Sequence, residues 1–207
     1  MSSSEQTIIY SSAVLYSLLM RVLYWPHFQD RYRAIAAEIP DGVSVVDVCA
    51  GDCYLYKEYL HRKSVDYLAL DISPQFVRSA RKRGITSREF NLWHDEVPAA
   101  DIILMHASLY QFLPNAEPIM RKLLAGARRK VIIAEPIRNL SDLRIPLVRT
   151  LVRRLTRPRT VGSTYVGGRF DQASLTSFFH SFEAFERAFA IPGGREMVGI
   201  FRGEHAS

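Results

Sequence analysis

The segment Val43-Ser-Val-Val-Asp-Val-Cys-Ala-Gly-Asp-Cys53 carries the strongest indication of the fold of this chain. Its first six residues are rich in β-branched valine, which is typical of a short strand buried on both faces of a sheet. Gly51 follows three residues after that run, and residues 54–63 then carry a helical pattern. A buried strand that turns tightly into a helix opens a βαβ unit, so we expect a parallel sheet.

Strand and helix patterns alternate along the next 90 or so residues. At Ser73-Pro74 we expect a helix start, with the serine hydroxyl as the cap and proline in the first helical position. The predicted order is a helix over 54–63, a strand over 67–71, a helix over 73–83, strands over 87–91 and 100–106, a helix over 116–127 and a strand over 130–134. Connections of this kind are right-handed crossovers between parallel strands.

The end of the chain departs from this alternation. Residues 182–191 and 196–202 are two strand-like runs joined by Pro192-Gly-Gly194, a sequence typical of a hairpin turn. The predicted fold class is therefore α/β: a doubly wound, Rossmann-like, mostly parallel seven-stranded sheet with a C-terminal antiparallel hairpin.

Two helices are expected before the first strand: residues 10–24, which are apolar nearly all round, and residues 28–39. They suggest a division into an N-terminal helical lid, residues 1–40, and a ligand-binding domain, residues 41–207, with a helical insert at 138–169. The longest apolar stretch, residues 13–25, is too short to span a bilayer. It also lacks the basic residues and the cleavage site of a signal peptide, so we expect a cytoplasmic protein.

The chain has the composition of a globular protein, with 48% hydrophobic and 23% charged residues and a net charge of +6. Cys49 and Cys53 are its two cysteines. A separation of four residues is too tight for a typical framework disulfide, and two thiols alone make a poor metal site. We therefore expect a reducing compartment and no bound metal.

In an open α/β sheet, ligands bind beyond the carboxyl ends of the strands. The residues that leave the first predicted strand are Asp47 to Cys53, and Asp71 closes the second strand twenty residues after Gly51. An acidic residue at that distance can accept hydrogen bonds from both ribose hydroxyls of a nucleoside-bearing cofactor.

These two segments resemble those of the class I S-adenosylmethionine-dependent methyltransferases, whose first motif is an acid followed by glycines at alternate positions. Asp47 matches the acid and Gly51 the central glycine, while Cys49 and Cys53 stand where the outer two glycines usually are. Cysteine resists the positive φ that glycine adopts freely. The resemblance implies S-adenosylmethionine as cofactor. The residues that it places at the cofactor are Asp47, Cys49, Ala50, Gly51, Cys53, Asp71, Ile72, Asn91, Leu92, Trp93 and His106.

The same resemblance extends to Asp101-Ile-Ile-Leu-Met-His-Ala-Ser-Leu-Tyr110, which looks like the family's fourth-strand motif beneath the methyl donor. It marks His106 and Tyr110 as candidate catalytic residues. The resemblance implies methyl transfer to an acceptor that we expect to be a small molecule or lipid-like.

The predicted insert is strongly basic, with eight arginines and a single acid, Asp142, between Arg138 and Arg169. Its apolar stripe is formed by Val148, Leu151, Val152 and Leu155. Its basic face is formed by Arg149, Arg153, Arg154 and Arg157. Such a helix either lies at a membrane interface as a peripheral contact or covers the acceptor as a lid. The pattern of alternating aromatic and basic residues found in nucleic-acid-binding segments is missing.

Two alternative functions remain open at this point. Asp71 would serve the ribose of NAD equally well, but the oxidoreductase fingerprint needs a third glycine, and Tyr54 occupies that place. A relative that binds S-adenosylmethionine without catalysis is the other alternative, because two of the usual glycines are replaced. The sequence gives no indication of the oligomeric state.

Overall fold

The protein is described by a computed structural model over residues 27–137 and 168–204. The predicted first helix, residues 10–24, lies outside these residues. The apolar stripe and basic face of the insert, residues 148–157, lie outside them as well.

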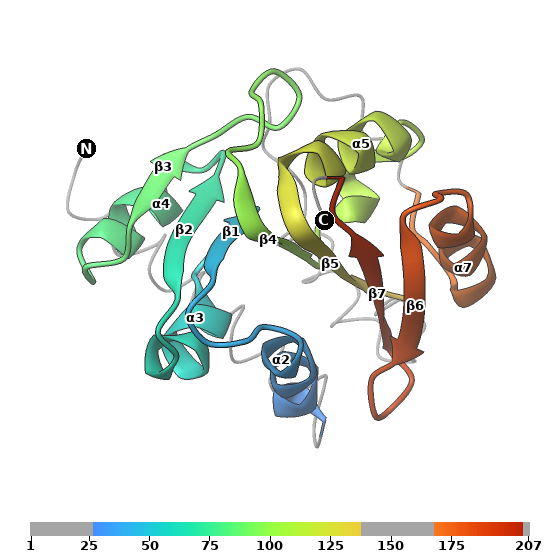
Figure 1. Cartoon of the computed structure of the whole chain (residues 1–207), viewed down its shortest axis with the longest axis horizontal. Helices are drawn as coiled ribbons and strands as arrows, with labels where there is room; N and C mark the ends of the chain where they lie inside the picture. Colours follow the sequence, from blue (N-terminus) through green and yellow to red (C-terminus); the bar gives the residue numbers. More distant parts are fainter. Residues whose placement is uncertain (1–26, 138–167, 205–207) are drawn as a thin grey trace, which may run out of the picture.

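One seven-stranded sheet organises the described residues, in the order β3-β2-β1-β4-β5-β7-β6 (Figure 1). The first five strands are parallel, and β7 is antiparallel to both β5 and β6. The strands span Ser44–Val48 (β1), Asp66–Asp71 (β2), Ser87–Glu89 (β3), Ala100–His106 (β4), Ala127–Pro136 (β5), Phe185–Ala190 (β6) and Glu196–Arg202 (β7). The predicted fold class and its terminal hairpin are confirmed.

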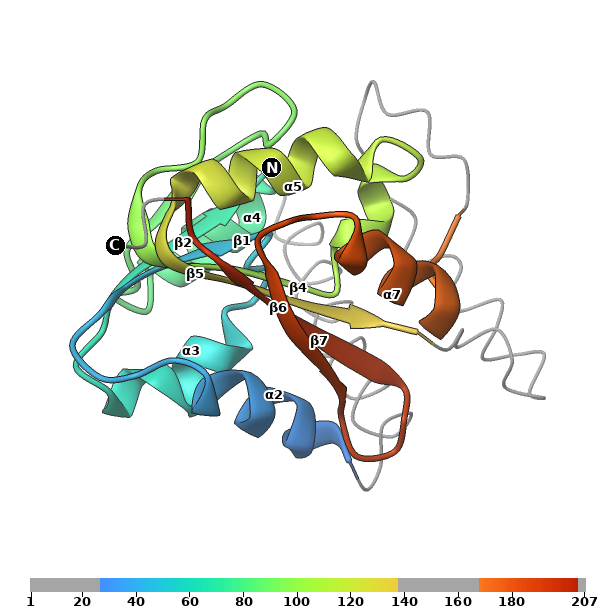
Figure 2. The ribbon, with the colours of Figure 1, turned by 45° about the vertical axis from the view of Figure 1, so that its right-hand side comes forward.

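Helices cover both faces of the sheet, with α2 and α3 on one face and α5 and α7 on the other (Figure 2). The core accordingly falls into two clusters. Ile35, Leu55 and Leu104 belong to the α2 side, whereas Ile119, Phe179 and Met105 belong to the α5 side. The helical segments are Phe28–Ala37 (α2), Tyr54–Glu58 (α3), Leu60–Arg62 (η1), Pro74–Arg81 (α4), Leu109–Phe112 (η2), Ala116–Gly126 (α5) and Gln172–His180 (α7).

Several local predictions were wrong. The predicted helix over 54–63 breaks at Tyr59 into α3 and the 3₁₀ segment η1. Pro74 does occupy the first turn of α4, but the Ser73 hydroxyl makes no cap and instead donates to Gln75 Oε1 at 2.8 Å. Strand β5 begins three residues before, and β6 three residues after, the predicted starts at 130 and 182.

Helix α7 was not predicted at all. It begins with a capping box, in which the Asp171 carboxylate accepts from Ser174 N at 2.7 Å and the Ser174 hydroxyl accepts from Asp171 N at 3.0 Å. The usual box has Glu or Gln at the second position, so serine there gives a weak sequence signal.

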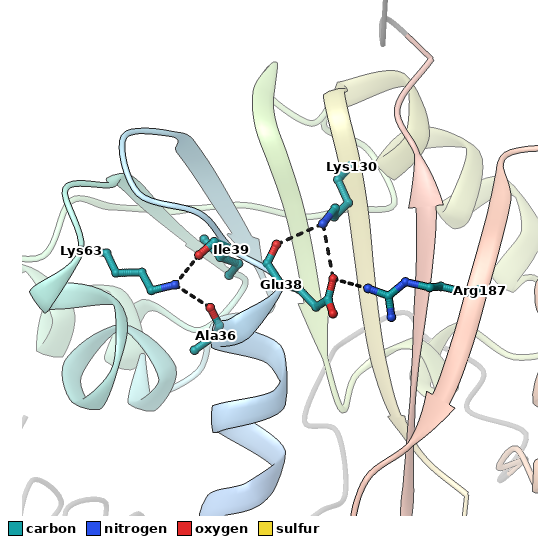
Figure 3. A network of polar contacts seen from close by, with 6 residues as sticks. All are labelled: Ala36, Glu38, Ile39, Lys63, Lys130 and Arg187. Carbon is teal, nitrogen blue, oxygen red and sulfur yellow. Dashed lines mark hydrogen bonds and ion pairs between the residues drawn. The ribbon is translucent and has the colours of Figure 1, made fainter.

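The C-terminal end of α2 is anchored at the amino edge of the sheet (Figure 3). Lys63 Nζ donates to the carbonyls of Ala36, at 2.7 Å, and Ile39. The Ala36 carbonyl also accepts from Ile39 N at 3.3 Å, so Lys63 adds a second donor at this end of the helix, where a cation complements the helix dipole. Glu38 in turn pairs with Lys130 of β5 at 3.4 Å and with Arg187 of β6 at 2.6 Å.

No helix within the described ranges combines the length and apolar character needed to cross a bilayer.

Candidate functional site

The loop from β1 to α3 has left-handed backbone at three alternate positions. The φ angles are 61° at Cys49, 55° at Gly51 and 56° at Cys53. A 3.0 Å hydrogen bond from Cys53 N to Ala50 O closes the turn between them. Both cysteines therefore adopt the conformation that glycine would supply, at a cost on the order of 1–2 kcal/mol each. The loop keeps the shape expected of three glycines although only one is present.

Asp71, the last residue of β2, holds this loop in place. Its Oδ2 accepts from Gly51 N at 2.8 Å, and its Oδ1 accepts from Ser73 N at 2.8 Å. Burial raises the pKa of Asp71, and these two backbone donors oppose that rise. A carboxylate offers about four lone-pair directions, so two backbone donors leave room for two more hydrogen bonds.

The space above Gly51 is open. A Cβ built on this glycine would meet no protein atom within 4 Å. A side chain at position 51 would therefore not collide with the rest of the protein. Within the protein itself, only the left-handed φ favours glycine at this position. A ligand that approaches the loop backbone closely would use the same space. The loop, its open glycine and the partly free carboxylate of Asp71 fit the adenosyl part of a nucleoside-bearing cofactor.

Beyond the ends of β2 and β3, large apolar side chains face solvent. Residues Asp71 and Glu89 are paired in register, so Ile72 and Asn91 each follow a neighbouring strand end. Within the described ranges the exposed large hydrophobic side chains are Ile72 (46% exposed), Trp93 (42%) and Phe76 (36%). Two of these three, Ile72 and Trp93, are among the residues that the resemblance places at the cofactor.

The segment 91–93 divides between loop surface and core. Asn91 Oδ1 accepts from Trp93 N at 3.2 Å, which closes a local turn. Leu92 is buried in the core on the α5 side, whereas Trp93 lies outside and rests on Phe112 with ring centroids 5.2 Å apart. The resemblance places both Leu92 and Trp93 at the cofactor, and Trp93 is thus the one with an available face.

Asp47 lies beneath the loop, in β1, and is only 4% exposed. Its Oδ2 accepts from the Tyr67 hydroxyl at 2.7 Å, and the Tyr67 ring stacks on Tyr56 at 4.3 Å. Burial raises the pKa of Asp47 to about 7; the hydrogen bond from Tyr67 acts against this rise, while the charge of Asp71 adds to it.

His106 closes β4, beside the start of the loop, because Val48 pairs with Met105 one residue before it. Its Nε2 lies 2.8 Å from Glu196 Oε1 and 2.7 Å from Arg31 Nη2. Arg31 Nε also lies 2.8 Å from Glu196 Oε2, in an ion pair whose side chains are 3% and 2% exposed. Three elements distant in sequence, α2, β4 and β7, thus meet at one buried charge cluster.

Tyr110 lies in η2 and packs against the α5-side core cluster, while the Arg169 guanidinium carbon sits 4.3 Å from its ring centroid. His106, by contrast, contacts Arg31 of α2, on the opposite face. The backbone N–H groups of Leu109 and Tyr110 donate to Glu135, at 2.9 and 3.4 Å. Burial raises the pKa of Glu135 to about 8. The two candidate catalytic residues are therefore not brought together.

Sequence reasoning missed Arg31, Glu135 and Glu196. The rule that singled out Asp71, an acid at the carboxyl end of a buried strand, also applies to Glu135. Glu196 has a subtler signal: because β7 is antiparallel, its first residue lies at the carboxyl edge of the parallel strands. Arg31 carries no such signal, since a basic residue in an amphipathic helix is normally solvated.

No protein-family model and no curated protein matches this chain. Solved structures match it in fold. The magnesium protoporphyrin IX methyltransferase of Synechocystis, solved with bound S-adenosylhomocysteine, is 13% identical and aligns over 96% of this chain and all of its own, with a TM-score of 0.60. A TehB-like S-adenosylmethionine-dependent methyltransferase of Corynebacterium glutamicum is 16% identical over 84% of this chain and 88% of its own, with a TM-score of 0.52.

These likenesses show the fold: it is that of the class I S-adenosylmethionine-dependent methyltransferases. The [4+2]-cyclase SpnF is another match, 13% identical over 86% of this chain and 83% of its own, with a TM-score of 0.59. Because this fold also occurs in a protein named for a cyclisation, the reaction of the present chain has to be argued from its site.

The two loop cysteines should be chemically inert. Burial raises the pKa of the Cys53 thiol to about 12 and that of Cys49 further still, and nearby carboxylates add to both shifts. Because only the thiolate reacts, iodoacetamide should modify either cysteine at least about a hundredfold more slowly than free cysteine at neutral pH. The Cys49→Ser/Cys53→Ser variant should keep cofactor affinity within several-fold. Rapid alkylation, or loss of binding on oxidation, would contradict this.

Asp47 should make the ligand-free protein less stable as pH rises. Its pKa is raised on folding, so the contribution of its protonated form to the stability of the folded protein is fully present below about pH 4. This contribution is lost as pH rises through 7. The free energy of unfolding of Asp47→Asn minus that of the wild type should therefore rise by about 2–3 kcal/mol between pH 5 and pH 8. Urea unfolding at both pH values measures this, with the exposed Asp66→Asn as control. An unchanged difference would refute a neutral buried Asp47.

Proposed function

We propose that this protein is an S-adenosylmethionine-dependent methyltransferase that acts on a small-molecule or lipid-like acceptor. The observation that carries the proposal is the loop from β1 to α3. It keeps left-handed backbone at 49, 51 and 53, its amide at Gly51 is fixed by Asp71, and the space above Gly51 is open.

In this proposal each group has a definite task. The two unused lone-pair directions of Asp71 accept from the ribose hydroxyls, and Gly51 lets the cofactor approach the loop backbone. Ile72 and Trp93 contact the two faces of the adenine ring, and Asn91 bonds its edge. Asp47, Cys49, Ala50 and Cys53 hold the loop that carries these contacts.

The bound cofactor supplies an electrophilic methyl group on a sulfonium, and transfer is an in-line displacement. The protein's own work is to hold the acceptor in line with that methyl group and to exclude water. The part of the fold suited to this is the carboxyl edge beside His106, where α2 adds Phe28 and Tyr32. The Tyr32 ring lies 4.5 Å from that of Tyr54 and 5.2 Å from that of His106. Such an apolar, aromatic wall suits a small or lipid-like acceptor.

A small cavity of about 180 Å³ lies between the start of α2, at His27 and Arg31, and the β6–β7 turn, at Pro192 and Arg195. Its lining includes neither His106 nor the β1–α3 loop, so it is separate from the proposed position of methyl transfer.

Cofactor binding without methyl transfer is the second candidate, favoured by the occurrence of this fold in a protein named as a cyclase. The two candidates differ in product: only a methyltransferase releases S-adenosylhomocysteine when an acceptor is supplied. Incubation with S-adenosylmethionine and an acceptor panel, followed by mass spectrometry, separates them.

Asp71→Asn should weaken binding of both S-adenosylmethionine and S-adenosylhomocysteine. Hydrogen bonds to a charged group contribute about 1.5–3 kcal/mol each, so the expected loss is at least about tenfold. Asp66→Asn is the matched control, because it removes the same charge from the exposed start of the same strand. Isothermal titration calorimetry measures both variants. Equal affinity of Asp71→Asn and Asp66→Asn would refute the ribose assignment.

Gly51→Val should abolish cofactor binding because its side chain occupies the space that the cofactor needs. Gly84→Val is the control: Gly84 also has a positive φ, +75° against +55°, and an added Cβ there also meets open space. Both variants should thus lose similar stability from backbone strain, on the order of 1–2 kcal/mol. Thermal unfolding measures the stability that each variant loses through backbone strain. Calorimetry measures the cofactor affinity that is lost when the added side chain fills the cofactor's space. Equal cofactor affinity of Gly51→Val and Gly84→Val would refute the position of the cofactor above Gly51.

A further inference from the structure

We propose that His106 is the proton acceptor for a hydroxyl-bearing acceptor, that Glu196 orients it, and that Arg31 anchors Glu196. The proposal rests on the methyl-transfer function proposed above and narrows its substrate class to acidic hydroxyls, such as phenols and enols. Glu196 and Arg31 are positioning residues in this arrangement, and neither touches the substrate.

The proposed role requires that the proton of the neutral His106 ring is on Nε2, and the contact with Glu196 favours that tautomer. Nε2 lies 2.8 Å from Glu196 Oε1, and an ionised carboxylate can only accept. In the tautomer that pairs with Glu196, Nε2 therefore carries the proton and the lone pair is on Nδ1. Residues 27–137 and 168–204 offer Nδ1 no hydrogen-bond partner. His106 is 15% exposed and is the last residue of β4, at the carboxyl edge of the sheet, and Nδ1 is the ring nitrogen left for an acceptor in this tautomer.

Glu196 is held as an anion. Burial acts to raise the pKa of Glu196, but the charges of Arg31 and His106 keep this pKa below its ordinary value. Its second oxygen pairs with Arg31 Nε, so the carboxylate is fixed from two sides. A buried carboxylate oriented in this way stabilises the imidazolium that forms when Nδ1 takes a proton, as in a carboxylate–histidine dyad.

Arg31 has the opposite effect on His106. Its Nη2 lies 2.7 Å from Nε2, and a guanidinium only donates, so it favours the tautomer with the proton on Nδ1. Burial lowers the pKa of His106 and Arg31 lowers it further, while Glu196 and then Asp52 raise it; the net shift is downward. The ring is edge-on to Tyr32, at 88°. Arg31 thus holds Glu196 in place and also keeps the imidazole neutral at neutral pH.

A neutral and weakly basic imidazole selects the acceptor. Proton transfer is efficient when the pKa values of donor and base are close, so an alkanol is a poor partner and a phenol or enol a better one. In the reaction, a lone pair on the acceptor oxygen forms the bond to the methyl carbon as the carbon–sulfur bond breaks and its electron pair returns to sulfur. The hydroxyl proton passes to Nδ1 and is then lost to solvent, which restores the neutral ring.

The test compares 4-methylphenol with 4-nitrophenol, which is far more acidic and ionises largely by itself at mildly alkaline pH. Full-length protein is incubated with S-adenosylmethionine and either phenol, and release of S-adenosylhomocysteine is measured. His106→Gln should lower kcat for 4-methylphenol at least about a hundredfold and for 4-nitrophenol much less. His61→Gln, an exposed histidine in η1, is the control and should leave both rates unchanged.

Glu196→Gln should reproduce this selective loss to a smaller degree, with the pKa of His106 lowered further in a side-chain NMR titration. That variant leaves Arg31 buried without its partner, so it can lose stability. Arg31→Met/Glu196→Met removes both charges together and avoids that problem. It should fold and again lose 4-methylphenol turnover selectively, with KM for the phenol unchanged.

Equal loss of both phenols in these variants would show a structural role only and overturn the proposal. So would an NMR spectrum in which His106 of the wild type carries its proton on Nδ1. Failure to methylate either phenol, with cofactor binding intact by calorimetry, would overturn the substrate class and leave the proposed methyltransferase standing. Absence of cofactor binding itself would remove both.

Discussion

The hydrogen bond from Gly51 N to the Asp71 carboxylate is the interaction on which the rest of the site depends. It joins the loop after β1 to the end of β2, and the two strands that meet there are buried. The fold forces left-handed backbone at Cys49 and Cys53 although cysteine disfavours it. The loop shape is therefore set by its anchors, and glycine is required only at position 51, where a ligand would approach.

A second constraint fixes the wall of the site. Helix α2 is held at its C-terminal end by Lys63, Lys130 and Arg187, at the amino edge of the sheet. Near its start it is held by the buried pair of Arg31 and Glu196, at the opposite edge. Buried ion pairs contribute little net stability, but breaking one is costly, so such a pair fixes geometry more than it stabilises. In this fold it sets where His106 lies relative to the loop.

The sequence was sufficient for the features with a local or periodic signal. The strand over 100–106 has the predicted bounds, and Asp71 lies where its spacing from Gly51 predicts. The hairpin was readable from Pro192-Gly-Gly194 because turn residues are chemically distinctive. The capping box that begins α7 was missed because serine stands in its second position.

The charge cluster at His106 could not be predicted, because it depends on register between distant elements. Arg31 and Glu196 are 165 residues apart in sequence and meet only because β7 runs antiparallel beside β5. Neither residue differs in its local sequence from an ordinary solvated charge. Alternation along β4 turns His106 toward α2, whereas Tyr110 lies beyond the strand, in η2, and packs on the α5 side.

We propose that the β1–α3 loop binds S-adenosylmethionine rather than a nicotinamide dinucleotide. Calorimetric titration of the wild-type chain with S-adenosylhomocysteine and, separately, with NADH distinguishes the two cofactors. Saturable binding of S-adenosylhomocysteine at one site per chain, with no heat of binding from NADH, is the expected result. Saturable binding of NADH with none of S-adenosylhomocysteine would refute the assignment of the loop.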